Sequence, residues 1–447
     1  MKLKNFKVAQ SPFLIFLPFL ILYVVMILIL AKDVTDGDEG RYLMYAQNLT
    51  HGFYTLPPPY LDLGNGPGYP LIITPFIALK VPLIYIKLMN ALFYYFSVIL
   101  LFKALQEIVR FKYAIIFSII WALYPNTFEA ISYVLPEVFA SSLIPLIIFT
   151  IIKAFKSQDA KQNGRYILFA GLSSGYLALT KPIFGYVLIF MIIGTLLFLI
   201  TNKTKVNLKR SVAILIIGFI ITIPWLAYTY SMTGKILYWS SFGGNNLYWM
   251  SSPYENESGS YTNYPFDSIN DKYLLPGSAE QIKLNHEKDF EQILENKEAQ
   301  KLYIKNGVVI GSPYTGLIQD TILKRIAFQN IKSHPFKFIL NCFSNAGRIF
   351  FNYPADYTPQ KPSTLFRLPV NGTLLVFSAF CFIITLLNWK RVLFSIRFLL
   401  FFGLLYFGGS LLGSAGPRMA CLFVPILLIW IAYIISKSLR IQLDWQN

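Results

Sequence analysis

The chain has 447 residues, of which 55% are hydrophobic and only 14% carry a charge. Because a soluble protein usually devotes about a quarter of its residues to charge, this composition excludes an ordinary soluble domain and predicts a polytopic membrane protein. The net charge of +17 is explained by basic cytoplasmic loops, so we expect no nucleic-acid partner. The three cysteines show no paired spacing that would indicate a disulfide framework or a zinc motif.

Ten apolar segments are predicted to cross the membrane as helices. The first, 12–31, follows Lys2, Lys4 and Lys7, as the core of a signal peptide would. An acidic stretch rather than a small-residue cleavage site comes after it, so we interpret it as a retained helix. The other nine are 82–102, 113–124, 136–152, 166–180, 183–200, 211–230, 370–388, 394–413 and 418–436.

The placement of Lys and Arg orients these helices. A single arrangement puts every basic loop on one side, including the loops that contain Lys103, Lys156 and Lys205. By the positive-inside rule this side is the cytoplasm, and both termini lie there. We therefore expect a multi-pass protein of the plasma or inner membrane. Its predicted parts are an N-terminal transmembrane module 1–231 with a first external loop 32–80, an external region 232–368, and C-terminal transmembrane helices 369–447.

The first external loop opens with four acids next to an uninterrupted apolar helix. Carboxylates at the membrane surface are costly unless they are solvated, paired or metal-bound, which makes them functional candidates. A solvated juxtamembrane loop is the alternative interpretation. Two short amphipathic helices, near 40–49 and 69–79, are expected to lie along the surface. The acids are Asp33, Asp36, Asp38 and Glu39.

The region 232–368 differs sharply in composition from the rest, because eleven of the 22 acids fall between Glu255 and Asp320. We expect a helical stretch at about 279–306. An amphipathic segment should begin at Ser333-His334-Pro335 and lie at the interface or pack on the bundle. A series of aromatic residues could stack on sugar or anchor the region at the interface. These are Trp239, Tyr248, Trp249, Tyr254 and Tyr261.

Under this topology the unusual charged residues converge on the outer face. A lipid-linked donor would suit a site there, because its chain stays in the bilayer and its phosphate lies at headgroup depth. Lys or Arg would neutralise that phosphate as it leaves, and a carboxylate would deprotonate an acceptor hydroxyl. The candidates are Asp36, Asp38, Glu39, Arg41, Glu129, Glu137, Lys181 and Arg418.

The order of short motifs resembles the GT-C class of membrane glycosyltransferases, which use polyprenyl-phosphate sugars. Within this class the chain is similar to the bacterial family 39 proteins, which are related to protein O-mannosyltransferases and to the aminoarabinose transferase of lipid A. The most specific piece is GDEGRY at 37–42, and the likeness extends over nearly the whole chain. The other pieces are GPGYP at 66–70, LPE at 135–137, TKP at 180–182, IPW at 223–225, TGK at 233–235, SHP at 333–335 and GPR at 416–418.

The resemblance implies an all-α polytopic fold and roles for seven residues. Asp38 would be the catalytic acid or base, with Glu39 beside it; their alternative role is to cap and charge the first turn of a surface helix. Three cations would bind the donor phosphate, although a surface ion pair or snorkelling to headgroups also explains them. These cations are Arg41, Lys181 and Arg418, and Asp36 and Glu137 are possible substrate or metal contacts.

Two departures from the family pattern affect the expected ligands. Relatives often carry a basic residue before the paired prolines, but the segment 65–70 has none. Only His51, His286 and His334 are present, so a tightly held transition metal is not expected. Oxygen-ligated Mg²⁺ or Mn²⁺ at Asp36 and Asp38 remains compatible with the sequence.

The sequence therefore predicts an inverting-type glycosyltransferase that moves a sugar from a polyprenyl phosphate to a glycan, lipid or protein acceptor outside the membrane. Its transition state should resemble an oxocarbenium ion. One alternative is a polymerase or ligase of lipid-linked oligosaccharides, although such an enzyme would not need the 37–42 motif directly after the first helix. A lipid-oligosaccharide transporter is the other alternative. It would predict charges in mid-helix and internal repeats, and neither is evident.

Overall fold

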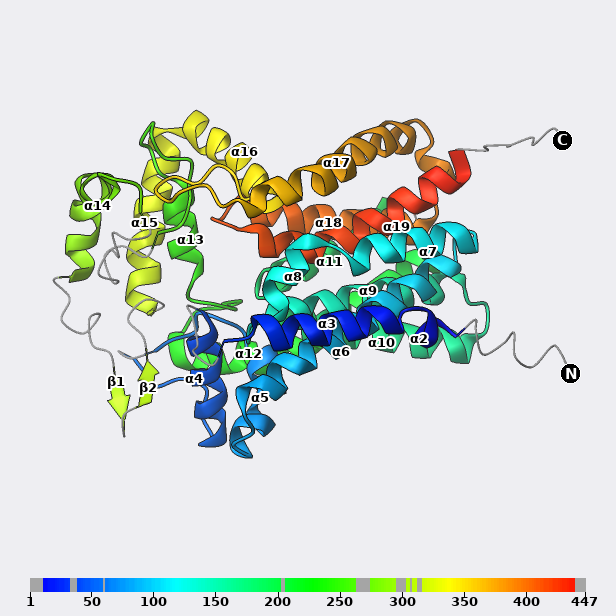
Figure 1. The fold of residues 1–447 in the computed structure, drawn as a ribbon, viewed down its shortest axis with the longest axis horizontal. Helices are drawn as coiled ribbons and strands as arrows, with labels where there is room; N and C mark the ends of the chain where they lie inside the picture. The colour runs from blue at the N-terminus through cyan, green and yellow to red at the C-terminus, as the bar shows by residue number, and fades with distance from the viewer. Residues whose placement is uncertain are drawn as a thin grey trace, which may run out of the picture.

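A computed structural model describes residues 11–32, 38–58, 61–201, 206–262, 274–294, 303–305, 308–311 and 316–438. These residues are almost entirely helical, and most of the helices run side by side as a long bundle (Figure 1). The first helix α2 (Pro12–Ile15) begins at the same end of the bundle at which the last helix α19 (Ala420–Ser438) ends. The opposite end carries the short helices and connecting segments that form the site.

The N-terminal part of the bundle follows the predicted segments closely. Proline begins several of its helices, as at Pro125 and Pro136, where its missing N–H leaves no hydrogen bond unmade. The chain bends by 47° between α7 and α8, just before Pro125. The helices are α2, α3 (Leu17–Leu30), α6 (Leu83–Gln106), α7 (Phe111–Ala122), α8 (Pro125–Ile131), α9 (Pro136–Lys156), α10 (Ala160–Thr180), α11 (Ile183–Thr201) and α12 (Val206–Thr233).

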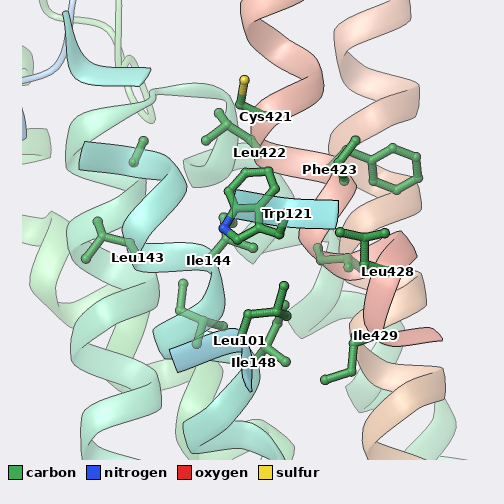
Figure 2. Packing of buried hydrophobic residues seen from close by; sticks show 14 of the residues in the cluster. Leu101, Trp121, Leu143, Ile144, Ile148, Cys421, Leu422, Phe423, Leu428 and Ile429 are labelled. Carbon is green, nitrogen blue, oxygen red and sulfur yellow. The ribbon is translucent and has the colours of Figure 1, made fainter. Parts of the chain in front are cut away.

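The last helix, α19, is the centre of the bundle rather than its edge. It packs against α6, α7, α9, α17 (Ser363–Leu387) and α18 (Phe394–Leu411). Figure 2 shows Trp121 between side chains of the N-terminal helices, such as Ile144, and side chains of α19, such as Leu422. The 3-10 helices η3 (Trp389–Arg391) and η4 (Pro417–Met419) precede α18 and α19.

Opposite the end at which α2 begins, the molecule consists of short elements from two distant parts of the sequence, named the outer end after the predicted topology (Figure 1). The first part is the loop after α3, with α4 (Asp38–Thr50) and α5 (Gly68–Ala78). The second part comes after α12 and contains α13 (Gly243–Met250), α14 (Ser278–Leu294), α15 (Leu317–Ser333) and α16 (Pro335–Phe351). Two short antiparallel strands, β1 (Tyr303–Lys305) and β2 (Val308–Gly311), also belong to it.

Each of the ten segments predicted to span the membrane is helical. Among the described residues, six helices are by themselves long and apolar enough to cross a membrane, and the bent pair α7–α8 would make a seventh. The chain is therefore a multi-pass membrane protein, while the total of ten spans stays a prediction. Helix α10 is not among the helices that are long and apolar enough to cross a membrane by themselves, and α3 and α11 are shorter apolar helices.

In the region 232–368, several helices differ from the predicted ones in their bounds or were not predicted. The predicted helix 279–306 ends at Leu294 as α14, and residues 303–305 form a strand instead. The amphipathic segment is confirmed as α16, but α13 and α15 were not predicted. Helix α17 begins at Ser363, earlier than the predicted start at 370. The two helices expected in the first loop are present as α4 and α5, and their position along the membrane surface stays a prediction.

Candidate active site

Asp38 stands at the start of α4, where its carboxylate meets two arginines. Its Oδ2 accepts a hydrogen bond from Arg418 Nη2 at 2.9 Å, although the two residues are 380 positions apart in the chain. Its Oδ1 lies 3.7 Å from Arg41 Nη2, one helical turn further along α4. The side chain of Asp38 keeps 38% of its surface exposed, so it remains accessible.

A second carboxylate, Glu137, joins the same network from the first turn of α9. Lys181 Nζ donates a hydrogen bond to Glu137 Oε1 at 2.8 Å, and Arg418 Nη1 lies 3.7 Å from the same oxygen. Glu137 and Lys181 are both buried. Arg418 therefore stands between two carboxylates, and Glu137 Oε2 is buried without a hydrogen-bond partner among the described residues.

Glycines bring the end of α10 against the start of α5, and this contact places Lys181. A Cβ atom at Gly66 would lie 2.1 Å from the carbonyl oxygen of Leu179, and one at Gly68 would lie 2.4 Å from Thr180 Oγ1. Only glycine permits such a close approach of one backbone to another. The motifs at 66–70 and 180–182 thus form one packed unit beside the charged network.

The electrostatics of the network favour an ionised Asp38. Burial alone would raise the pKa of the Asp38 carboxyl, but Arg41 and Arg418 outweigh that effect and hold this pKa below its ordinary value. A carboxyl flanked by two guanidinium groups is charged at neutral pH. Asp38 therefore enters any reaction as a carboxylate that can accept a proton.

The network lines a cavity of about 1670 Å³ between the bundle and the outer elements. Its charged lining comprises five cations, Arg41, Lys181, Lys324, Arg348 and Arg418, against two carboxylates, Asp38 and Glu137. The excess of positive charge suits an anionic ligand such as a phosphate. Apolar side chains also reach the lining, among them Ile77, Leu83 and Ile183. The cavity can therefore receive a molecule that is anionic at one end and apolar at another.

Five of the seven residues singled out from the sequence are brought together in this cavity, and Glu39 is not. Glu39 is 1% exposed; its Oε1 accepts a hydrogen bond from the Val134 amide at 2.7 Å and lies 3.6 Å from Lys87 Nζ. The catalytic position predicted for Glu39 is thus corrected, because successive residues of a helix point about 100° apart. Asp36 lies outside the described residues.

The aromatic residues of 239–261 are mostly core residues, contrary to the sugar-stacking expectation. Trp239, Tyr248 and Trp249 are each at most 1% exposed. Tyr261 lines the cavity, together with Phe242, whose ring lies 5.9 Å from that of Tyr261. The Arg41 guanidinium stacks over the Phe242 ring at 5.3 Å, so one aromatic wall adjoins the charged network.

The sequence interpretation missed three cavity residues. Arg348 belongs to α16 and Lys324 to α15, and neither lies in a recognisable motif. Asn65 lines the cavity from the segment 65–70, which lacks a basic residue, and it accepts a hydrogen bond from Tyr42 Oη at 3.1 Å. The amphipathic pattern of α16 was visible in the sequence, but no pattern indicated that its polar residues would face a cavity.

The described residues fit a divalent cation poorly at Asp38. Magnesium needs several oxygen ligands, yet both carboxylate oxygens of Asp38 face guanidinium groups. Within the described ranges, no three His, Cys, Asp or Glu side chains are grouped so that they could hold a metal ion. Metal dependence therefore stays a prediction.

Known proteins resemble this chain in sequence over one part and in fold over most of it. Residues 64–228 match the family model of dolichyl-phosphate-mannose-protein mannosyltransferase. None of the curated proteins matches the sequence. The matched part contains the motifs at 66–70, 135–137 and 180–182, which supply Glu137 and Lys181 to the cavity.

Two solved structures of the oligosaccharyltransferase of Archaeoglobus fulgidus share the fold. The complex tethered with an acceptor peptide that contains the NVT sequon is 13% identical; the match covers 96% of this chain and 50% of that one, with a TM-score of 0.51. The AglB complex with an inhibitory peptide and a dolichol-phosphate is 14% identical, with a TM-score of 0.51 and coverage of 94% and 50%. Our chain thus spans about half the length of these proteins.

A further solved structure is ArnT from Cupriavidus metallidurans bound to undecaprenyl phosphate. It is 13% identical, with a TM-score of 0.42 and coverage of 97% of this chain and 77% of that one. The archaeal structures and the family model together confirm the resemblance seen in the sequence. The chain is a polytopic membrane protein with the fold of the GT-C glycosyltransferases.

Proposed function

We propose that the chain is an integral-membrane glycosyltransferase, which transfers a sugar from a polyprenyl-phosphate donor to an acceptor at the outer face of the membrane. The observation that carries this proposal is the network in which Arg418 joins Asp38 to Glu137 and Lys181. Four segments far apart in the sequence supply these side chains to one cavity. The family match and the GT-C fold support the same activity.

In the proposed reaction the acceptor hydroxyl attacks the anomeric carbon of the sugar. A carbon–oxygen bond forms to the acceptor while the bond from the sugar to the phosphate breaks, and the polyprenyl phosphate leaves with the bonding electrons. The acceptor proton passes to Asp38, which is ionised beforehand. Arg418 and Lys181 stabilise the growing negative charge on the departing phosphate. Bond breaking leads, so the sugar resembles an oxocarbenium ion.

Arg418 couples donor binding to the strength of the base. In the structure, its guanidinium helps to keep the pKa of Asp38 low. A donor phosphate competes with Asp38 for this guanidinium, since both are anions that accept its hydrogen bonds. When Arg418 turns to the phosphate, the pKa of Asp38 rises and the carboxylate becomes a better proton acceptor. The base is thus strengthened only after the donor is in place.

The test is a donor-to-acceptor transfer assay with purified protein in lipid nanodiscs. Undecaprenyl phosphate linked to a radiolabelled sugar serves as the donor, and candidate acceptors are compared by class: glycan, lipid and peptide. The wild-type chain should transfer label, and Asp38→Asn should not. Glu280→Gln is the control, because Glu280 is an exposed acid on α14. Equal turnover by Asp38→Asn and the control would reject the proposed base.

The proposed orientation, with both termini in the cytoplasm and the cavity outside, has its own test. Single cysteines replace Glu255, which is exposed in the outer region, and Lys205, in a background without Cys342, Cys381 and Cys421. A membrane-impermeant thiol reagent added to intact cells should label Glu255→Cys but not Lys205→Cys. Labelling of Glu255→Cys only after the membrane is opened would place the cavity inside.

A further inference from the structure

The cations of the cavity fall into two groups that differ in their partners. Arg41, Lys181 and Arg418 each have a carboxylate within 4 Å. Arg348 and Lys324 line the same cavity, but neither forms an ion pair with a described residue. The first group is the site of the proposed reaction, and the second group has no role in it.

Arg348 is an unusual cation because it is buried and incompletely hydrogen-bonded. Only 5% of its surface is exposed. Its Nη1 donates to the carbonyl and hydroxyl oxygens of Ser258 at 2.8 and 3.0 Å, and its Nη2 donates to Asn345 Oδ1 at 3.2 Å. Its Nε is buried without a partner among the described residues. A buried guanidinium normally requires a carboxylate or another anion.

Asp356, the carboxylate whose charge acts on Arg348, does not supply that anion directly. Its oxygens accept hydrogen bonds from the Ser258 and Ser260 amides at 2.9 Å and from the Ser258 hydroxyl. Ser258 therefore separates Asp356 from the guanidinium. Burial lowers the pKa of Arg348 to about 10, although Asp356 opposes the shift. Its charge is thus compensated only in part by the protein.

The position of Arg348 connects it to the proposed active site. One turn before it on α16, Asn345 donates to the carbonyl oxygens of Ser410 and Gly413 at 3.0 and 2.7 Å and accepts from the Ala415 amide at 3.1 Å. The segment 410–415, to which Asn345 is bonded, leads directly into η4, which carries Arg418. The aromatic wall of Phe242 and Tyr261 runs beside Ser260 in the lining of the cavity. The two cation groups therefore face one continuous space.

We infer that Arg348, assisted by the exposed Lys324, forms a second anion subsite in the cavity, which holds a phosphate or carboxylate other than the phosphate that leaves at Arg418. This inference rests on the proposed function for the identity of the first anion. The second anion has two possible sources: a further phosphate on the donor, as in a polyprenyl diphosphate, or an anionic group on the acceptor. Either source supplies the anion that a buried guanidinium normally requires.

Binding measurements with purified full-length protein in phosphatidylcholine nanodiscs test the subsite without relying on turnover. The probes are undecaprenyl phosphate, undecaprenyl diphosphate, and radiolabelled inorganic phosphate titrated into protein saturated with undecaprenyl phosphate. The variants are Arg348→Gln, Arg348→Lys and Lys324→Gln. Lys332→Gln is the matched control, because Lys332 is an exposed lysine on the same helix, α15, and does not line the cavity.

The two sources give different results. If the donor supplies the second anion, Arg348→Gln weakens diphosphate binding at least tenfold and leaves monophosphate binding within about twofold. If the acceptor supplies it, Arg348→Gln weakens binding of inorganic phosphate to the saturated protein at least tenfold. Lys324→Gln should weaken the same probe by about threefold, since an exposed charge contributes less. Lys332→Gln should change neither.

The variant Arg348→Lys distinguishes an anion subsite from a purely structural role. Lysine keeps the positive charge but cannot reproduce the paired hydrogen bonds to Ser258. If Arg348 binds an anion, this variant should recover most of the anion binding and little of the lost thermal stability. The inference is overturned if neither Arg348→Gln nor Lys324→Gln changes binding of any probe. Should Arg348→Gln not fold, Lys324→Gln against Lys332→Gln decides. A protein that binds inorganic phosphate through Arg348 but no polyprenyl phosphate would reject the proposed function and retain the subsite.

Discussion

Two networks centred on carboxylates differ in how completely the protein satisfies their hydrogen bonds. In the cavity, Asp38 is partly exposed and Glu137 Oε2 has no partner among the described residues. In the outer region, Glu257 is 3% exposed. Its Oε1 accepts from Asn285 Nδ2 at 2.7 Å, from His286 Nε2 at 2.9 Å and from the Tyr357 hydroxyl. Its Oε2 accepts from Ser252 Oγ at 2.5 Å.

The two networks differ in the way expected of a binding site, in the cavity, and of a structural connection, around Glu257. The Glu257 carboxylate accepts four hydrogen bonds from the protein. These bonds connect the segment after α13 to α14 and to the segment before α17. Such a saturated buried carboxylate stabilises and orders the fold. The cavity network instead leaves charge and hydrogen-bonding capacity unused, as a site must if a substrate is to complete it. Four experiments can break or sharpen this distinction.

The largest effect is expected for Asp38→Asn. Loss of a general base typically lowers the rate by about 10²–10⁴-fold, and the amide also loses the attraction of Arg41 and Arg418. Transfer should therefore fall to near background while the protein stays folded in the membrane. Turnover from donor titrations, together with a thermal melt, measures both quantities. Retention of most of the turnover would remove Asp38 from the chemistry.

The next effect concerns the cations of the cavity network. Arg418→Ala and Lys181→Ala should each lower kcat/KM for the sugar donor by about 10²–10³-fold. Each substitution removes a cation that hydrogen-bonds to the departing phosphate. The KM for the acceptor should change much less. Kinetics with donor and acceptor varied separately measure the two effects. Unchanged donor kinetics in both variants would assign these residues to structural ion pairs with Asp38 and Glu137.

In the outer network, Glu257→Gln should reduce stability and spare the chemistry. The amide cannot accept all four hydrogen bonds and leaves His286 without its ionised partner, so we expect a loss of about 3 kcal/mol. Glu255→Gln is the matched control, since Glu255 is exposed two residues away. Thermal melts and the turnover of the remaining folded enzyme are the measurements. A selective loss of turnover without destabilisation would make Glu257 part of the site.

The smallest expected effect is a dependence of the melting temperature on pH, which is visible only in acid. Burial alone would raise the pKa of Glu257, but its hydrogen bonds, those from His286 and Ser252 among them, lower it to about 2. A depressed pKa means that the stabilisation is fully present above the ordinary pKa of a glutamate and is lost as the pH falls toward 2. The melting temperature of the wild type should therefore drop between about pH 5 and pH 2. Glu257→Gln should lack this part of the drop, and an identical drop in both would contradict the assignment.

The sequence predicted the helices well because a membrane-spanning helix is defined by local composition. It also identified Asp38, Glu137, Lys181 and Arg418 as candidates, because charges flanking apolar segments are conspicuous. The direction of each side chain depends on packing, which the sequence does not display. Glu39 is adjacent to Asp38 and yet points in a different direction from α4, where it pairs with Lys87.

The outer region was predicted less well for a related reason. Its helices have mixed polarity, so α13 and α15 give no clear periodic signal. The burial of Trp239 and Tyr248 results from tertiary contacts, such as the hydrogen bond from Tyr248 Oη to Asp289 at 2.7 Å. Arg348 could be assigned a role only after α16 had been placed against the cavity. Long-range contacts, rather than local pattern, determine this part of the molecule.

The separation of Asp38 from Arg418 by 380 positions also has a consequence for biosynthesis. At about 5–20 residues per second, a ribosome needs roughly 20–75 seconds to travel from one residue to the other. Toward the end of that interval the emerging chain has Asp38, Arg41 and Lys181, but it lacks the arginine that joins them. Helix α19 must enter the middle of helices that are already in the bilayer before the cavity network is complete. A chain that terminates before Arg418 therefore lacks the contact that joins the first external loop to the start of α19.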